Sequence, residues 1–214
     1  MYDINKLSNG KYPNVYHFNS KWAIAEYIRS IGIPASFFMP GFYMSNLETM
    51  MTPSPQPPHA YTIALPMPPT TPIPWFDAAD DTGKFVKGML MNREKVLGKE
   101  VFAATDYITP VQVAETFALV KKEAGKGAGF VQLDADTYKG FLAKAGMPQF
   151  VQEELYENMA FLDEFGYYGK GSLDWSHSVS RSPSIRPHKH RYLVVVHPTE
   201  KTEERTPANH PSIA

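Results

Sequence analysis

The sequence predicts an α/β fold in which a parallel sheet is flanked by helices. Between residues 34 and 165, short apolar segments typical of strands alternate with longer amphipathic segments typical of helices. An early helix also leads into a short apolar strand that ends at a Pro-Gly turn. Ligands of open α/β sheets bind at the carboxyl ends of the strands. The turn after this strand is therefore where we expect a site.

The early helix is indicated by apolar residues at helical spacing from Trp22 to Ile31. A glycine and a proline follow directly and end the pattern. Asn19 or Ser20 is predicted to cap the helix, because short polar side chains accept hydrogen bonds from the first free N–H groups.

The remaining elements follow in order along the chain. They are a strand at 36–39, a helical turn or short helix within 41–51, a proline-rich surface loop at 52–59, a pair of strands at 60–65 and 73–76, a helix at 78–91 capped by Asp77, a strand at 98–104, a helix from 110 to about 123 behind Thr109, a strand at 130–133, a helix capped by Asp134 to about 145, and a helix from 148 to about 165.

The composition changes near residue 178, where Ser, Pro, Thr and charged residues become frequent. We therefore expect one domain over residues 1–178. Residues 179–214 are expected to form a mostly disordered tail with at most a weak strand at 192–196.

The bulk composition excludes several classes of function. The net charge of −1, from 21 basic and 22 acidic residues, gives no overall field that would attract nucleic acid or an anionic membrane. The absence of cysteine excludes disulfides, thiolate metal sites and a cysteine nucleophile. No apolar run approaches the ~20 residues of a membrane span, and no signal peptide is visible. We expect a cytoplasmic or nuclear protein without a metal site.

Lys21 is the first candidate site residue, because it lies in the first turn of the early helix. It could donate a hydrogen bond to a nucleotide ribose or a substrate oxygen; a solvated surface lysine is the more common alternative. A tyrosine four residues before a lysine can have its pKa lowered for proton transfer. Here His17 holds that position and Tyr16 lies five residues before Lys21. His17 could transfer protons or simply bind backbone groups.

The second candidate is the segment after the Pro-Gly turn. Gly41 permits a close backbone approach or a positive φ, and the aromatic pair Phe42 and Tyr43 could stack on a flat ring. A tight turn with two core aromatics is the alternative. The aromatic loop at 165–170 could likewise wall a pocket or pack on the core.

Several of these segments together resemble the NmrA-like family, a group of atypical short-chain dehydrogenase relatives that includes fungal nitrogen-metabolite regulators. The segments are His17-Phe-Asn-Ser-Lys21, Ile31-Gly-Ile-Pro34, Met39-Pro-Gly-Phe-Tyr-Met-Ser-Asn-Leu47, Ile73-Pro-Trp-Phe-Asp77 and Thr109-Pro-Val-Gln-Val-Ala-Glu115, within a resemblance that spans about residues 3–177.

The resemblance implies a Rossmann-like parallel sheet, a small α/β C-terminal lobe and an NADP cofactor. By this resemblance Lys21 would reach the cofactor ribose. The residues beside the nicotinamide would be Phe42, Tyr43, Met44, Ser45 and Asn46.

Two departures from the family pattern shape the expected activity. Family members begin with a Gly-rich βαβ unit that binds the pyrophosphate at a helix N-terminus, and this sequence contains no such loop. Val179 onward also looks unrelated to the family. We therefore expect a truncated product that lacks the nucleotide-binding half and binds NADP weakly or not at all.

Three functions are carried forward. The first is a redox-sensing regulator that binds the dinucleotide and signals to a protein partner such as a transcription factor, without direct contact to nucleic acid. The second is an NADPH-dependent reductase of a small carbonyl or enone, with Lys21 and either His17 or Tyr43 in proton transfer. The third is an inactive fragment that exposes a sheet edge and self-associates.

Overall fold

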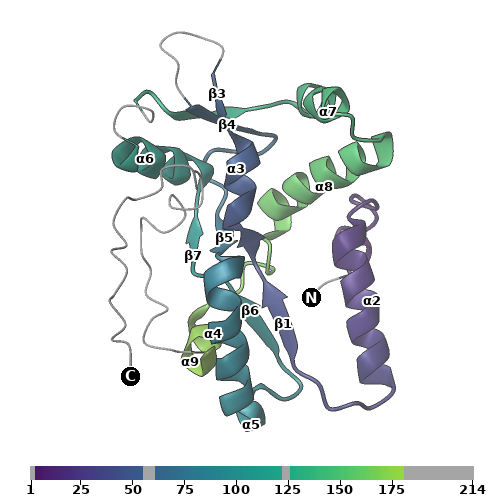
Figure 1. Ribbon diagram of the computed structural model, residues 1–214. Helices are drawn as coiled ribbons and strands as arrows, with labels where there is room; N and C mark the ends of the chain where they lie inside the picture. Colours follow the sequence, from purple (N-terminus) through teal and green to yellow (C-terminus); the bar gives the residue numbers. More distant parts are fainter. Residues whose placement is uncertain (1–2, 55–60, 122–125, 181–214) are drawn as a thin grey trace, which may run out of the picture.

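A computed structural model describes residues 3–54, 61–121 and 126–180 of the chain (Figure 1). The strand expected at 192–196, nearly all of the expected tail and most of the proline-rich loop lie outside these ranges. Across the described ranges, no helix combines the length and apolar character needed to cross a membrane.

The described elements follow one another as an α/β chain. They are α1 (Ile4–Leu7), α2 (Tyr16–Ser30), β1 (Phe37–Pro40), β2 (Phe42–Tyr43), the 3₁₀ turn η1 (Met44–Asn46), α3 (Leu47–Met50), β3 (Met51–Pro53), β4 (Tyr61–Leu65), β5 (Ile73–Phe76), α4 (Ala78–Met91), α5 (Arg93–Val96), β6 (Glu100–Ala103), β7 (Asp106–Ile108), α6 (Pro110–Val120), β8 (Gly129–Gln132), α7 (Ala135–Lys144), α8 (Gln149–Phe165) and α9 (Asp174–Ser180).

The central strands form one continuous surface although their ladders are separate. β1 pairs with β6 in parallel, and β5 lies between β2 and β7. The Gly41 N–H donates to the Ala103 carbonyl at 2.9 Å, and the Thr105 N–H donates to the Trp75 carbonyl at 2.7 Å. The chain runs from β1 directly into β2, and from β6 through a short turn into β7. β5 therefore lies between β2 and β7, just beyond the point where β1 and β6 stop pairing. This confirms the predicted α/β class with a parallel sheet.

A smaller α/β lobe lies at the top of the molecule in Figure 1. Its sheet has the order β3-β4-β8, with β4 parallel to β8 and antiparallel to β3. Buried side chains from β4, α6, α7 and α8 belong to one apolar core, with Ile63, Phe117, Tyr138 and Met159 among them. Burial of this core holds the lobe together.

Predicted helix starts hold where a short polar side chain can reach its own first turn. The Asp77 carboxylate accepts from the Asp80 N–H at 3.0 Å, and the helix it caps has the predicted bounds. Thr109 and Gln112 form a reciprocal capping box in front of α6. The Asp134 carboxylate caps α7 by accepting from the Thr137 N–H at 2.8 Å.

Both strands predicted at 60–65 and 73–76 exist, as β4 and β5. They belong to different sheets, because β4 joins the lobe sheet and β5 joins the central sheet. All four residues of β5 are buried, which requires neighbours on both of its faces and edges. The partners that supply this burial include β7, an antiparallel strand that the sequence did not predict.

The predicted cap of the early helix is also wrong. α2 begins at Tyr16 behind Val15, which makes no side-chain cap bond. The Asn19 side chain instead accepts from the Ile4 N–H at 2.9 Å and ties α1 to α2. The Ser20 hydroxyl points back to the His17 carbonyl within the helix.

The last described helix, α9, packs against α4. A Cβ at Gly88 would lie 2.5 Å from the Cα of Ser180, so only glycine allows this approach. The Asn92 side-chain amide donates to the Val179 carbonyl at 2.8 Å. Val179 and Ser180, just beyond the expected boundary at residue 178, are therefore buried parts of the described fold.

Candidate functional site

The Pro-Gly turn lies at the carboxyl end of β1, at the same end of the molecule as the start of α2 (Figure 1). A Cβ on Gly41 would lie 2.3 Å from the Pro74 carbonyl oxygen and 3.2 Å from both the Ala104 Cβ and the Tyr168 hydroxyl. No other residue fits there. Gly41 thus lets β1 continue into β2 while the chain exchanges its neighbour β6 for β5.

Side chains after Gly41 alternate between the core and solvent. Phe42 and Met44 are buried, and the Phe42 ring meets the Trp75 ring edge-on at 5.1 Å. Tyr43 and Ser45 are exposed, and Asn46 is half-buried. Of the five residues expected beside a nicotinamide, the accessible side chains are therefore those of Tyr43, Ser45 and, in part, Asn46.

The aromatic loop between α8 and α9 packs against this turn and donates hydrogen bonds to it. The Tyr168 hydroxyl donates to the Met39 carbonyl at 2.7 Å, and the Tyr167 hydroxyl donates to the Pro40 carbonyl at 3.3 Å. The Tyr168 ring also stacks on Phe102 with centroids 4.4 Å apart. Of the two interpretations left open for this loop, packing on the core is the one observed.

The phenols of this loop are poor acids. Burial raises the pKa of Tyr167, and the nearby Tyr43 raises it further. Burial also raises the pKa of Tyr168 well above its ordinary value. Both hydroxyls therefore remain protonated near neutral pH and act as hydrogen-bond donors to the backbone.

Tyr167 connects the two candidate segments. Its ring meets Phe18 of α2 at 5.1 Å, while its hydroxyl reaches Pro40 and its pKa responds to Tyr43. The first turn of α2 and the end of β1 therefore meet around Tyr167. This contact brings the side of the helix that carries His17 close to the Tyr43 segment.

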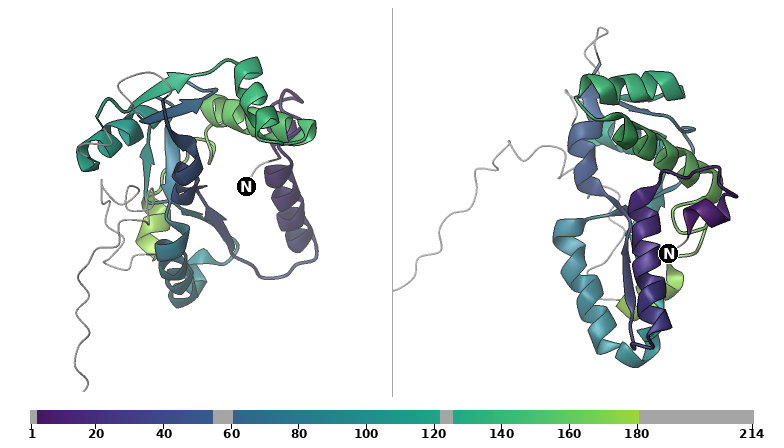
Figure 2. Two further views of the ribbon diagram at one scale, coloured as in Figure 1. Left: turned by 45° about the horizontal axis from the view of Figure 1, so that its top comes forward. Right: turned by 90° about the vertical axis from the view of Figure 1, so that its right-hand side faces the viewer.

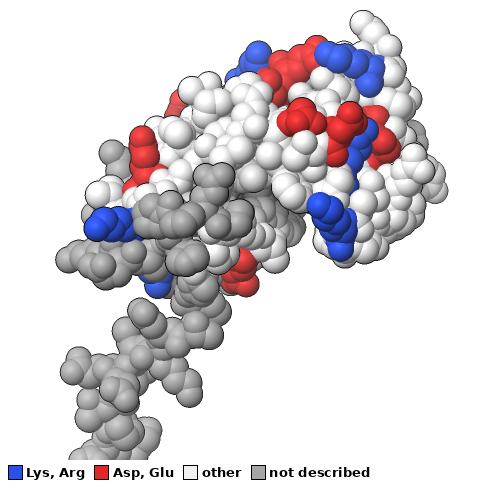
Figure 3. Space-filling view, turned by 90° about the horizontal axis from the view of Figure 1, so that it is seen from above, with Lys and Arg blue, Asp and Glu red and all other residues white. Residues whose placement is uncertain are grey.

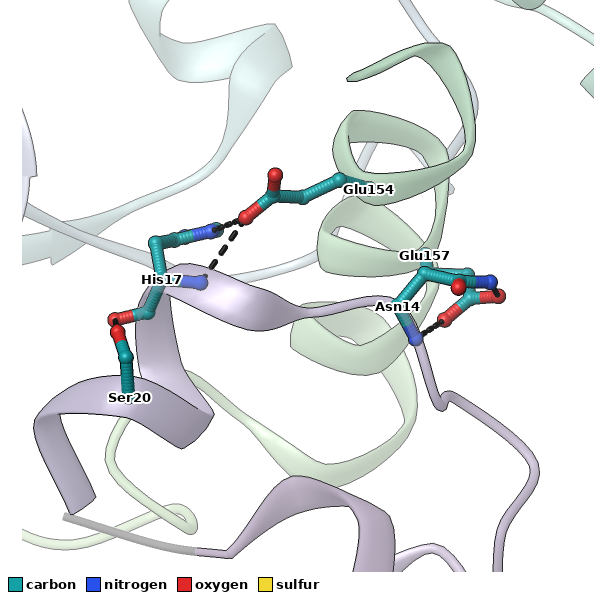
Figure 4. A network of polar contacts seen from close by, with 5 residues as sticks. All are labelled: Asn14, His17, Ser20, Glu154 and Glu157. Carbon is teal, nitrogen blue, oxygen red and sulfur yellow. Dashed lines mark hydrogen bonds and ion pairs between the residues drawn. The ribbon is translucent and has the colours of Figure 1, made fainter. Parts of the chain in front are cut away.

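His17 is held by a glutamate from α8. Its backbone N–H donates to Oε1 of Glu154 at 2.9 Å, and its ring Nδ1 lies 2.7 Å from the same oxygen (Figure 4). One turn further along α8, Glu157 accepts from the backbone and side-chain amides of Asn14, each at 2.6 Å. Carboxylates at a helix N-terminus are favoured by its free N–H groups and dipole. Glu154 thus does what was predicted of Asn19 or Ser20.

Lys21 lies in the second turn of α2, because the helix begins at Tyr16, and the predicted place in the first turn is wrong. Its side chain is exposed. Neither a hydrogen bond nor an ion pair joins it to the rest of the described chain. Its exposure fits a ligand-binding lysine and a solvated surface lysine equally.

The upper face of the molecule, on the side of the small lobe, has no dominant charge in the part of it that is described. Seen from above in Figure 3, acidic and basic side chains are interspersed over the side where α7 and α8 lie, and the centre is uncharged. Within residues 3–54, 61–121 and 126–180, no three His, Asp or Glu side chains cluster so as to hold a metal ion.

Two residues of the site were not singled out from the sequence as parts of it. Glu154 sits within an ordinary amphipathic helix, 137 residues from its partner His17, and no local pattern marks it. Tyr167 lies in the aromatic loop that sequence reasoning did single out, but its position between α2 and β1 depends on tertiary packing.

The fold is that of an α/β protein with a central parallel sheet, and Tyr43 and Ser45 are exposed just beyond the carboxyl end of β1. The model of the NmrA-like family matches residues 1–189. The chain therefore belongs to the NmrA-like family.

Relatives and solved structures agree with this assignment. The chain is 28% identical over 116 residues to the nitrogen metabolite repression protein nmr of Neurospora crassa, covering 51% of this chain and 24% of that protein. It is 27% identical over 114 residues to nmrA of Emericella nidulans, covering 51% and 32%.

NmrA, a negative transcriptional regulator solved in complexes with NAD and with NADP, is similar in structure, with a TM-score of 0.62 at 20% identity. The match covers 81% of this chain and 55% of that one. The chain thus spans about half the length of the solved relative.

Proposed function

We propose that this chain supplies the nicotinamide-facing side of an NAD(P) site in a redox-sensing regulator of the nitrogen-repression type. Tyr43 and Ser45 are accessible just beyond the carboxyl end of β1, where open α/β sheets bind ligands, and Lys21 is exposed on α2. The complexes of NmrA with NAD and NADP support a dinucleotide as the ligand class.

One observation favours a regulator over an enzyme. His17 occupies the position four residues before Lys21, and the buried hydroxyls of Tyr167 and Tyr168 are fixed on backbone carbonyls with raised pKa values. Binding without turnover needs donors and a flat contact surface, which Lys21 and Tyr43 supply.

Saturation-transfer NMR on the whole chain tests the site, since this method detects weak binding. With NADP in excess, we expect saturation of the nicotinamide protons to exceed that of the adenine protons, and Lys21→Ala to reduce it. Lys87→Ala, an exposed lysine on α4, is the matched control. Saturation confined to adenine, or unchanged in Lys21→Ala, would contradict the proposal.

The contact between His17 and Glu154 favours the second candidate, a reductase of a small carbonyl or enone. A histidine oriented by a carboxylate can transfer protons, with the carboxylate fixing the ring tautomer. The measurement is NADPH oxidation with a panel of such substrates. Turnover that disappears in both His17→Ala and Lys21→Ala would establish the enzyme and displace the regulator.

The remaining parts of the proposal concern affinity, partners and location. Because the sequence contains no Gly-rich phosphate loop, we propose that the chain alone binds NADP weakly.

A regulator of this type would pass the cofactor state to a protein such as a transcription factor, in the cytoplasm or the nucleus. Mass spectrometry of material captured with the tagged chain, with and without NADP, would identify that protein.

A further inference from the structure

One side chain of α8 is buried with its hydrogen-bonding capacity unused. Asn158 is 5% exposed, and its Oδ1 is completely buried without a hydrogen-bond partner in the described chain. Every other side-chain oxygen or nitrogen buried to that extent in residues 3–54, 61–121 and 126–180 has a partner. An unpaired amide oxygen in the core lowers stability, because it has lost its bonds to water. This cost points to a role other than folding.

Helix geometry places Asn158 between two packed faces of α8. Glu154, one turn before it, holds the start of α2, and Phe161, one turn after it, belongs to the apolar cluster shared with α1 and α2. Leu155 and Leu162 pack in the apolar core of the lobe. Residues three and four positions apart are neighbours on a helix surface. Asn158 therefore lies where the side of α8 that faces α2 meets the side that faces this core.

Glu154 supplies a second acceptor next to Asn158. Its Oε1 accepts from the His17 backbone and contacts the His17 ring, whereas Oε2 makes no hydrogen bond within the described chain and points away from that ring (Figure 4). The Glu154 side chain is 17% exposed and that of His17 is 45% exposed. Solvent therefore reaches the carboxylate beside His17, which gives a small molecule a way to the pair.

Ordered water alone is poorly suited to this position. A buried water takes about two to four polar partners. The residues three and four positions from Asn158 on α8 are Glu154, Leu155, Phe161 and Leu162, and Glu154 is the polar one among them. A group that brings apolar surface together with N–H donors fits these neighbours better than water does.

We propose that Asn158 and Glu154 form a two-acceptor site for the NH₂ group of a small planar primary amide, with one N–H donated to each side chain. Cβ atoms four residues apart on a helix are about 5–6 Å from each other, a span that one NH₂ group can bridge. The Asn158 amide can also donate to the carbonyl of the ligand. The rings of His17 and Phe18, with centroids 4.9 Å apart, border the site with flat surfaces.

A matched ligand series tests which group is recognised. Nicotinamide, N,N-dimethylnicotinamide and nicotinate share the pyridine ring, but only the first carries an NH₂ group. Their dissociation constants are measured on the full chain by titrations followed with saturation-transfer NMR. We expect nicotinamide to bind about tenfold more tightly than either of the others. Equal binding of all three, or no binding of nicotinamide, would overturn the proposal.

Asn158→Leu separates binding from folding. Leucine has a similar shape but no acceptor, so nicotinamide binding should weaken by about tenfold. The urea midpoint should stay the same or rise, because an unpaired buried oxygen has been removed. Gln152→Leu, the same kind of change on α8, is the matched control and should leave nicotinamide binding intact. A lower midpoint with unchanged nicotinamide binding would make Asn158 a structural residue and refute the site.

A second variant examines the carboxylate. Glu154→Gln exchanges one acceptor oxygen for a donor, so it should weaken nicotinamide binding several-fold and leave N,N-dimethylnicotinamide binding unchanged. Glu153→Gln, which alters the neighbouring glutamate bound to Lys139, is its control. An equal loss for both ligands in Glu154→Gln would mean that the carboxylate acts through the position of α2, and would remove it from the site.

The inference deepens the proposed function if the amide is the nicotinamide of the cofactor, and goes beyond it if the amide is a second molecule. Bound NADP that displaces nicotinamide indicates the first source, and simultaneous binding indicates the second. The two proposals fail separately. Nicotinamide binding through Asn158 without saturation of NADP would refute the function and keep the site. Lys21-dependent saturation of NADP with equal binding of the three pyridines would do the reverse.

Discussion

α2 and α4 are helices of similar length beside the same parallel strands, yet they are held in different ways. α4 has its own cap at Asp77, buries Phe85 completely and meets α9 at Gly88. α2 buries Ala25 and is attached mainly at its ends, by Glu154 at the start and by Arg29 to Glu100 and Phe37 at the finish. The comparison shows one helix with its packing complete and another whose packing surface is still open.

The largest expected effect lies in the completed helix. Phe85→Ala should lower the free energy of unfolding by about 3–5 kcal/mol, because it leaves a cavity at a fully buried position. Ile24→Ala in α2 removes an exposed side chain and should change it by about 0.5 kcal/mol or less. Urea unfolding measures both. Equal losses would mean that α2 is packed as tightly as α4.

The Pro-Gly turn should tolerate no side chain. Gly41→Ala places a Cβ 2.3 Å from a backbone oxygen, and should cost about 3 kcal/mol, toward the upper end of overpacking effects. Gly83→Ala in α4 meets nothing within 4 Å and should stabilise by about 1 kcal/mol through helix propensity. Both changes in the free energy of unfolding can be measured by chemical denaturation. A loss for Gly41→Ala together with a gain for Gly83→Ala supports the close approach at Gly41, and an unchanged free energy in Gly41→Ala contradicts it.

The hydrogen bond from the aromatic loop to β1 should contribute less to the free energy of unfolding. Tyr168→Phe leaves the ring stack intact but removes the buried bond to the Met39 carbonyl, at an expected cost of about 1–2 kcal/mol. Tyr16→Phe removes an exposed hydroxyl bond to Asn14 and should cost less than about 0.5 kcal/mol. Thermal and urea unfolding of both variants provide the comparison, and the reverse order would count against it.

The weakest effect concerns how the N-terminal segment is held on α8. Hydrogen bonds from Lys11 and Tyr12 lower the pKa of Glu164 from its ordinary value of 4.5. A lowered folded-state pKa means that this contribution is present above pH 4.5 and is lost as the pH falls through the folded value. The difference in unfolding midpoint between wild type and Glu164→Gln should therefore shrink under acid. Parallel pH profiles of the two proteins would show that this contact contributes nothing.

The sequence predicted a helix start correctly where the capping side chain lies directly before the helix, and not where it comes from a distant element. Asp77, Thr109 and Asp134 cap helices that begin directly after them, so local pattern was sufficient. Asn19 and Ser20 look equally suitable as caps, but a carboxylate from α8 occupies that role. A local pattern cannot reveal a partner so distant in sequence.

In the candidate site, too, local features were predictable from the sequence and features set by distant strands were not. Gly41 and the aromatic residues after it were identifiable because a Pro-Gly turn behind an apolar strand has few structural solutions. Which of these residues face outward was not predictable, since the alternation of Phe42, Tyr43, Met44 and Ser45 depends on the register set by β5. Which sheet each of β4 and β5 joins was not predictable for the same reason.

Amide hydrogen exchange on the chain alone tests the contrast between α2 and α4 most directly. We predict that the amides in the middle of α2 exchange much faster than those in the middle of α4, because Ile24 and Tyr27 are exposed whereas Phe85 of α4 is completely buried. Equal protection of the two helices in the chain alone would contradict the account.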